Sequence, residues 1–158
     1  MAIWQMRLAL VPASLLGVEA LRSGTAVLPA NLPSDDAWWR GVTAPEGLEG
    51  RLDRVLPRAA SWSDGMCIWG DEQGDALTAC YDEGGALEWL GVKIDARRVR
   101  PDLVVALCQF ADSAHAFFLA GRRCIPPDPA SLNEAIQASF AWKYVQDPVG
   151  ALKGLGSH

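Results

Sequence analysis

Apolar side chains occupy every second position across residues 4–10, and polar side chains stand between them at Gln5 and Arg7. This two-residue period is typical of a strand that buries one face. We therefore expect a first strand over residues 3–11, which Pro12 closes.

Three short apolar runs follow in the middle of the chain, at residues 66–69, 76–81 and 87–94. The intervening stretches 70–74 and 82–85 are rich in Gly, Asp and Glu, residue types that favour tight turns. Three short strands joined by two such turns predict an antiparallel meander. We expect the first strand to join this sheet, although the pattern does not give the strand order.

Three residues predict the start of a helix before the meander. Thr43 can cap it, Pro45 suits its first turn, and Glu46 completes a Thr-x-x-Glu capping box. Leu and Val then recur at helical spacing as far as Leu56, and Pro57 ends the pattern.

The last third of the chain predicts more helices and one more strand. Pro101 opens a segment whose apolar residues form a helical stripe. An Asp-Pro pair at 128–129 starts a helix that we expect to run through Phe140, and a second pair at 147–148 starts a short terminal helix. A strand is expected at 116–120.

Residues 14–21 predict a short helix, and the Pro- and Asp-containing stretch 25–36 predicts a loop. The predicted fold class is α+β, with a central antiparallel sheet (the meander at about 66–94 plus the N-terminal strand) packed with three to four helices. The 158 residues contain no linker, so we expect one domain over 1–158. We expect the terminal Gly-Ser-His to be vector-derived.

The net charge of −5 and the pI of about 4.9 limit the classes of partner that we expect. A nucleic-acid partner or an anionic membrane surface would require a cationic face, so neither is expected. No apolar run reaches the roughly 18 residues of a membrane span, and no charged segment introduces an export signal. We expect a soluble cytoplasmic protein, either an enzyme or a protein that meets a basic partner.

Metal and cofactor chemistry is not expected. No pair of the four cysteines has C-x-x-C spacing, and we interpret all four as buried free thiols. The acidic pairs Asp71-Glu72 and Asp82-Glu83 lack the alternation of a calcium loop and are interpreted as solvated turns. No glycine-rich phosphate loop opens a helix.

Catalytic signals are weak as well. Ser61 and Ser63 lack the G-x-S-x-G context of a nucleophile elbow. His115 is the one candidate general base, and a partly buried structural role is the favoured interpretation. Cys67 or Cys80 could face His115 across the sheet, but nothing in the sequence lowers a thiol pKa.

Asp95 and Arg97 stand two residues apart at the exit from the meander. They can bind a charged group of a partner, or form a salt bridge that anchors the end of the sheet. We favour the salt bridge.

Seven tryptophans are many for a chain of this length. Five lie in or just before the meander: Trp38, Trp39, Trp62, Trp69 and Trp89. The tandem Trp38-Trp39 can pack beneath the loop or supply an exposed anchor for a protein interface, where Trp and Arg are favoured.

Short motifs recur in a familiar order after the tandem Trp38-Trp39-Arg40-Gly41. They are Leu56-Pro57-Arg58, Ser61-Trp62-Ser63, Ile68-Trp69-Gly70, Tyr81-Asp82-x-Gly84 and Ile94-Asp95-Ala96-Arg97. Over about a third of the chain this order resembles a family of small uncharacterised bacterial proteins, some of which resemble immunity proteins of contact-dependent or polymorphic toxin systems. The resemblance implies a bacterial cytoplasmic α+β protein that neutralises a toxin.

The leading hypothesis is therefore a non-enzymatic module that binds a protein, namely a basic toxin domain. The candidate contact residues are Trp38, Trp39, Asp71, Glu72, Asp82 and Glu83. A small enzyme or ligand-binding protein that uses His115, and a homo-oligomer, stay open as alternatives.

Overall fold

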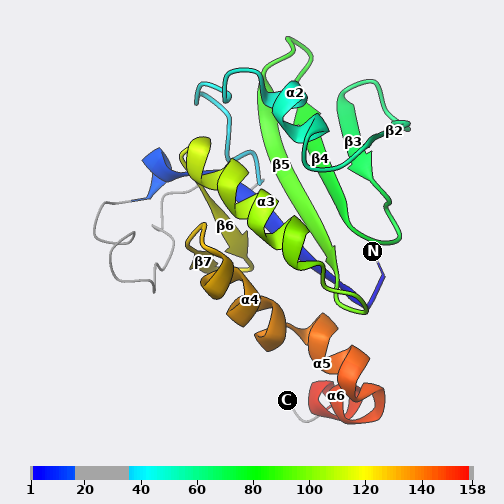
Figure 1. Cartoon of the computed structure of the whole chain (residues 1–158). Helices are drawn as coiled ribbons and strands as arrows, with labels where there is room; N and C mark the ends of the chain where they lie inside the picture. The colour runs from blue at the N-terminus through cyan, green and yellow to red at the C-terminus, as the bar shows by residue number, and fades with distance from the viewer. Residues whose placement is uncertain (1, 17–35, 157–158) are drawn as a thin grey trace.

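The computed structural model describes residues 2–16 and 36–156 (Figure 1). A single 3-10 turn, Ala13–Leu15, covers the start of the helix expected at 14–21. Residues 17–21 of that segment and residues 25–35 of the expected loop lie outside the described residues.

The described strands form one antiparallel sheet of seven strands in the order β2-β3-β4-β5-β1-β6-β7. They are β1 (Gln5–Pro12), β2 (Arg58–Ala59), β3 (Met66–Gly70), β4 (Ala76–Tyr81), β5 (Leu87–Asp95), β6 (Ala116–Ala120) and β7 (Arg123–Ile125). The predicted meander β3-β4-β5 is confirmed, and β1 joins it between β5 and β6. The sequence did not predict β2 and β7, because two or three residues carry no usable period.

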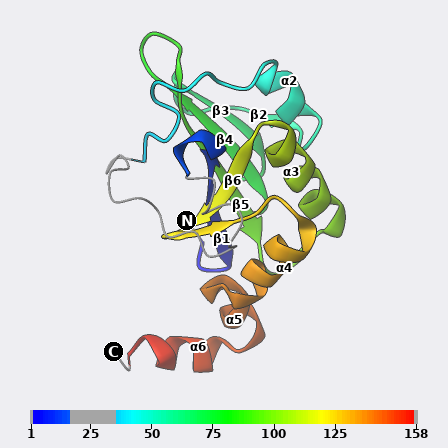
Figure 2. The same cartoon turned by 90° about the vertical axis from the view of Figure 1, so that its left-hand side faces the viewer.

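Helices cover one face of this sheet (Figures 1 and 2). They are α2 (Leu48–Asp53), α3 (Pro101–Ser113), α4 (Pro129–Ala138), α5 (Phe140–Gln146) and α6 (Pro148–Leu155). In Figure 2, α2, α3 and α4 follow one another along the sheet, whereas α5 and α6 extend beyond its end. The α+β class predicted from the sequence is confirmed.

The core lies between the sheet and α3. Leu8 stands opposite Val92, and Leu10 stands opposite Leu90, so all four side chains point to the helix-covered face. They are buried there together with Leu107 of α3. Burying each such side chain contributes about 1.5–3 kcal/mol relative to leaving it exposed.

Trp39 fills the place where β5 separates from β1. Backbone pairing of the two strands ends at Leu10 and Leu90. Beyond this point the backbone N–H of Trp39 donates to the Glu88 carbonyl at 3.0 Å, and its indole Nε1 donates to the Leu10 carbonyl at 2.9 Å. The side chain is only 2% exposed. Trp39 therefore hydrogen-bonds to both β1 and β5 at the point where the two strands no longer pair with each other.

Two helix predictions need correction. The first helix begins at Leu48 and not near Thr43, because Gly47 adopts a left-handed backbone (φ 65°) that no helix starting earlier could contain. The helix expected to run through Phe140 ends at Ala138. The backbone of Ser139 is extended there, and its side chain caps the next helix by accepting a hydrogen bond from the Trp142 N–H.

Candidate functional site

The turn between β3 and β4, residues 71–75, is fastened to the start of β1. The side-chain amide of Gln5 donates to the carbonyls of Glu72 at 2.9 Å and Gly74 at 2.7 Å, and its oxygen accepts from the Ala2 N–H. Gln5 is 4% exposed. Gln5 lies on the face opposite Met6 and Leu8, as the strand period predicts, but it is buried there because the turn folds over it and satisfies both of its N–H groups.

Trp4, just before β1, and Arg97, just after β5, hold the same turn. The indole of Trp4 and the guanidinium of Arg97 both donate to the Gln73 carbonyl at 3.3 Å. The guanidinium also lies 4.3 Å from the centre of the Trp4 ring, a cation–π contact. The backbone of the turn is therefore held at three successive residues, Glu72, Gln73 and Gly74.

Asp95 completes this anchorage. Its carboxylate accepts from the backbone and the guanidinium of Arg97, with an ion-pair distance of 2.8 Å. Hydrogen bonds from Arg97 hold the pKa of Asp95 below its usual value. The Asp95 N–H donates to the side chain of Asp75, whose own pKa is raised by burial. The favoured interpretation of Asp95 and Arg97 as a salt bridge at the sheet end is confirmed.

Trp62 lies beside this fixed turn with its ring facing solvent. It is 71% exposed, the highest value among the large apolar side chains of the described residues. Its indole Nε1 donates to the Glu72 carboxylate at 3.2 Å. The exposed Asp71 precedes Glu72 on the same turn, and its carboxylate accepts from the Gln73 N–H. We refer to Trp62, Asp71 and Glu72 as the Trp62 surface.

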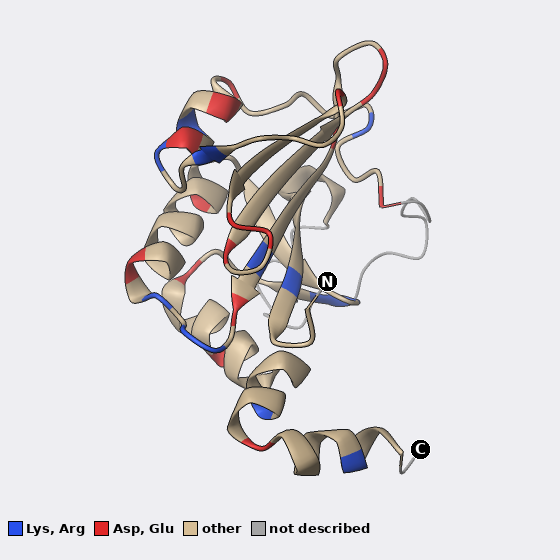
Figure 3. Ribbon diagram, turned by 90° about the vertical axis from the view of Figure 1, so that its right-hand side faces the viewer, with Lys and Arg blue, Asp and Glu red and all other residues tan. Residues whose placement is uncertain are grey.

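The other residues predicted as contacts lie elsewhere. Trp38 and Trp39 are 7% and 2% exposed, so they pack in the interior and do not form an exposed anchor. Asp82 and Glu83 occupy the β4–β5 turn, at the opposite end of β4 from Asp71 and Glu72 (Figure 3). Six residues of strand separate the two turns by about 20 Å. The six predicted residues therefore do not form one surface.

His115 is an exposed turn residue, so the expectation of partial burial was wrong. It links α3 to β6 with a left-handed backbone (φ 52°), and its carbonyl accepts from the Ala13 N–H. His115 lines none of the five principal cavities between the described residues. Cys67 and Cys80 lie on β3 and β4, which β5 and β1 separate from β6, so neither faces His115.

A polar cluster joins α2 to the sheet. The Asp53 carboxylate accepts from the Trp69 indole at 2.7 Å and from Arg58 Nε at 3.1 Å. The Arg58 guanidinium lies 5.1 Å from the centre of the Trp69 ring. The hydrogen bonds from Trp69 and then Arg58 lower the pKa of Asp53. These contacts fix the end of α2 against β2 and β3.

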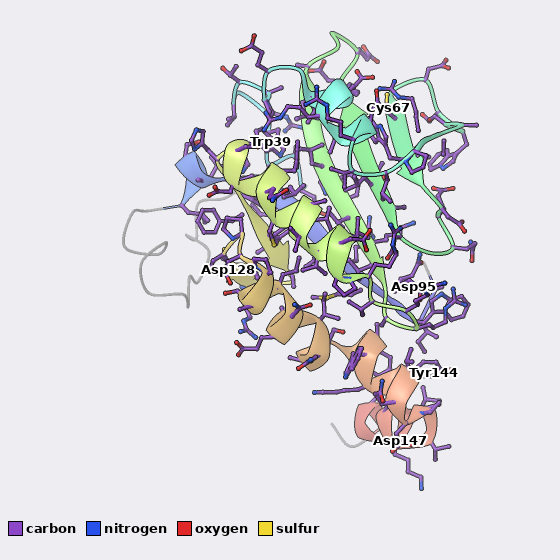
Figure 4. All side chains as sticks on the ribbon, viewed as in Figure 1. Trp39, Cys67, Asp95, Asp128, Tyr144 and Asp147 are labelled. Carbon is purple, nitrogen blue, oxygen red and sulfur yellow. The ribbon has the colours of Figure 1, made fainter. Side chains whose placement is uncertain are left out.

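Glu49 extends the cluster one helical turn earlier on α2. Its carboxylate accepts hydrogen bonds from Arg58 Nη1 at 2.8 Å, from the Tyr81 hydroxyl at 3.2 Å and from the Cys67 thiol. Burial and the Glu49 charge raise the pKa of both Cys67 and Tyr81 above their usual values. Burial also raises the pKa of Cys108, to about 12. The thiols of Cys67 and Cys108 are poor nucleophiles at neutral pH, because a raised pKa leaves little of the reactive thiolate form. Figure 4 shows the side chain of Cys67 close to α2.

Among residues 2–16 and 36–156, no group of three His, Cys, Asp or Glu side chains is arranged to hold a metal ion. In the same part of the chain, no helix has the length and apolar character needed to cross a membrane.

Comparison with known proteins found no matching protein-family model, no matching curated protein and no matching solved structure. The sequence pattern identified Trp62 and the adjacent pair Asp71-Glu72 but did not bring Trp62 to Glu72. Hydrogen bonds from Gln5 and Trp4 hold the turn that carries Glu72, and the first strand gave no sequence signal for them.

Proposed function

We propose that the chain is a non-enzymatic protein-binding module and that its Trp62 surface binds a basic protein. The particular function that we propose is an immunity protein that neutralises a basic toxin domain in the bacterial cytoplasm. The observation that carries the proposal is the exposed indole of Trp62, hydrogen-bonded to Glu72 on an acidic turn.

An exposed tryptophan is the kind of residue that dominates binding energy at protein interfaces. Here the ring is already oriented by Glu72, and the turn that carries Glu72 is already fixed by Gln5 and Trp4. Binding at this surface would therefore cost little conformational entropy, because its groups are already ordered. Such a preorganised aromatic ring beside the Glu72 carboxylate is well suited to a partner with Arg or Lys next to an apolar pocket.

The charge of the chain supports a basic partner. The net charge of −5 attracts a cationic protein over long range and raises its association rate. Many toxins of polymorphic systems act on nucleic acid and are basic. An acidic inhibitor on such a toxin competes with the phosphate groups of its substrate, which connects the charge to neutralisation.

The test is co-expression with the protein encoded beside this gene. We expect the wild-type chain to protect the cells and to co-purify with the neighbouring product. The Trp62→Ala variant should lose much of both effects. Val105→Ala, which truncates another exposed apolar side chain on α3, should retain them. No protection and no co-purification by the wild-type chain would reject the proposal.

A further inference from the structure

A four-residue turn, residues 63–66, lies directly after the exposed Trp62. Its central residues Asp64 and Gly65 are both exposed and belong to no helix or strand. One hydrogen bond closes the turn, from the Met66 N–H to the Ser63 carbonyl, and its length of 3.3 Å is long for a bond of this type. The turn therefore opens at little cost, since one weak bond at the surface holds it.

Asp64 and Gly65 carry two groups that can react with each other. Asp64 is the one Asp of the chain that precedes a Gly. Among the described residues, the Gly65 N–H has no acceptor and the Asp64 carboxylate has no donor. Gly65 also has no side chain to crowd its nitrogen. The carboxyl carbon of Asp64 can therefore approach that nitrogen once the turn opens.

We propose that Asp64 is a site of spontaneous isomerisation to isoaspartate. In the first step, the Gly65 nitrogen attacks Cγ of the protonated Asp64 carboxyl group, and the new N–Cγ bond closes a five-membered succinimide ring. The proton of the nitrogen and the hydroxyl of the carboxyl group leave together as one water molecule.

The second step opens the ring by adding one water molecule to either of its carbonyl carbons. Cleavage of the bond between the nitrogen and Cγ restores aspartate. Cleavage of the bond between the nitrogen and the main-chain carbonyl carbon of residue 64 gives isoaspartate. One water leaves and one returns, so the mass is unchanged and no oxidant or reductant is needed.

Isoaspartate lengthens the backbone inside the turn. The chain then runs through Cβ and Cγ of residue 64, which adds one backbone atom between Ser63 and Met66 and separates the partners of the closing bond. Ser63 is itself tied to Ser61, whose hydroxyl donates to the Ser63 carbonyl and accepts from its N–H. These bonds fix both neighbours of Trp62, so isomerisation releases its indole from Glu72.

Incubation of the purified chain for several weeks at physiological temperature tests the reaction. Cleavage after glutamate places Asp64 and Asp82 in separate peptides, because Glu72 lies between them. The Asp64 peptide should split into two chromatographic peaks of equal mass. The new peak should accept a methyl group from an isoaspartate-specific methyltransferase. In water enriched in heavy oxygen it should gain the label, because water opens the ring.

Two controls separate this reaction from general ageing of the protein. Asp82 lies in an exposed turn but precedes Glu83, so its peptide should stay a single peak. Asp64→Glu should abolish the second peak of the Asp64 peptide, because a glutamate side chain would have to close a larger ring. An Asp64 peptide that stays a single peak throughout the incubation overturns the proposal, as does equal conversion of Asp82.

The indole N–H resonances of isotope-labelled protein test the effect on Trp62. Trp62→Phe identifies the Trp62 resonance. In the isomerised chain this resonance should move, whereas those of the buried Trp39 and Trp69 should stay in place. An unmoved Trp62 resonance in isomerised protein contradicts the release of the indole. The inference does not rest on the proposed function, because the reaction and its effect concern the chain without a partner.

Discussion

The indole N–H of Trp62 donates to the carboxylate of Glu72 across 3.2 Å, while the ring stays 71% exposed. The hydrogen bond orients an apolar surface next to a negative charge instead of burying either group. Because Gln5 holds the backbone of Glu72, the orientation of the ring is tied to the first strand of the sheet. An exposed tryptophan with this much support has the properties of a binding anchor.

Replacing Gln5 tests the anchorage of the turn. Gln5→Ala leaves the partly buried carbonyls of Glu72 and Gly74 without their donor. We expect the free energy of unfolding in urea to fall by about 1–3 kcal/mol. Gln137→Ala, at an exposed position of α4, should change it by less than about 0.5 kcal/mol. Equal effects of the two substitutions would show that Gln5 does not fasten the turn.

Replacing Trp39 tests its role between the diverging strands. Trp39→Phe keeps an aromatic ring in the core but removes the donor to the Leu10 carbonyl. The expected loss is about 1–3 kcal/mol of unfolding free energy, since a buried acceptor loses its partner. The matched substitution Trp62→Phe at the surface should be nearly neutral. Thermal and urea unfolding of both variants give the comparison, and an unchanged Trp39→Phe protein would be inconsistent with this role.

The cluster at Asp53 predicts a pH dependence of stability. Its carboxylate has a pKa lowered by the hydrogen bonds from Trp69 and then Arg58, so the folded state favours the charged form. A lowered pKa stabilises the fold above the unfolded value of about 3.9 and loses that contribution as pH falls through the folded value.

Asp53→Asn should therefore be less stable than wild type at pH 7, and the difference should shrink as the pH falls below about 4. Urea titrations at a series of pH values measure this difference. Asp64→Asn, in the exposed loop before β3, serves as the control. If the difference in unfolding free energy between wild type and Asp53→Asn stays constant down to pH 2, the ionised Asp53 carboxylate is not its cause.

Much of the fold could be predicted from the chain itself. The strands at 76–81 and 116–120 were predicted at their observed bounds, as were the starts of α3, α4 and α6. In each case the local signal agrees with the tertiary role: a short apolar run ends at a Gly-containing turn, or a proline stands at the first helical position. Where local and tertiary preferences coincide, the pattern is sufficient.

The remainder depends on contacts between distant segments. Gln5 has the periodicity of an exposed residue and is buried only because a turn about seventy residues later closes over it. Thr43 carries a complete capping box, yet the left-handed backbone at Gly47 moves the helix start four residues later.

Calorimetric titration with the product of the neighbouring gene tests the binding role of Trp62 most directly. With Trp62→Ala, we expect a dissociation constant at least about 30-fold higher than wild type, the loss expected for an interface anchor. Val105→Ala should stay within about threefold of wild type. Wild-type affinity for Trp62→Ala, in a protein that unfolds at the wild-type urea midpoint, would show that Trp62 is not the binding anchor.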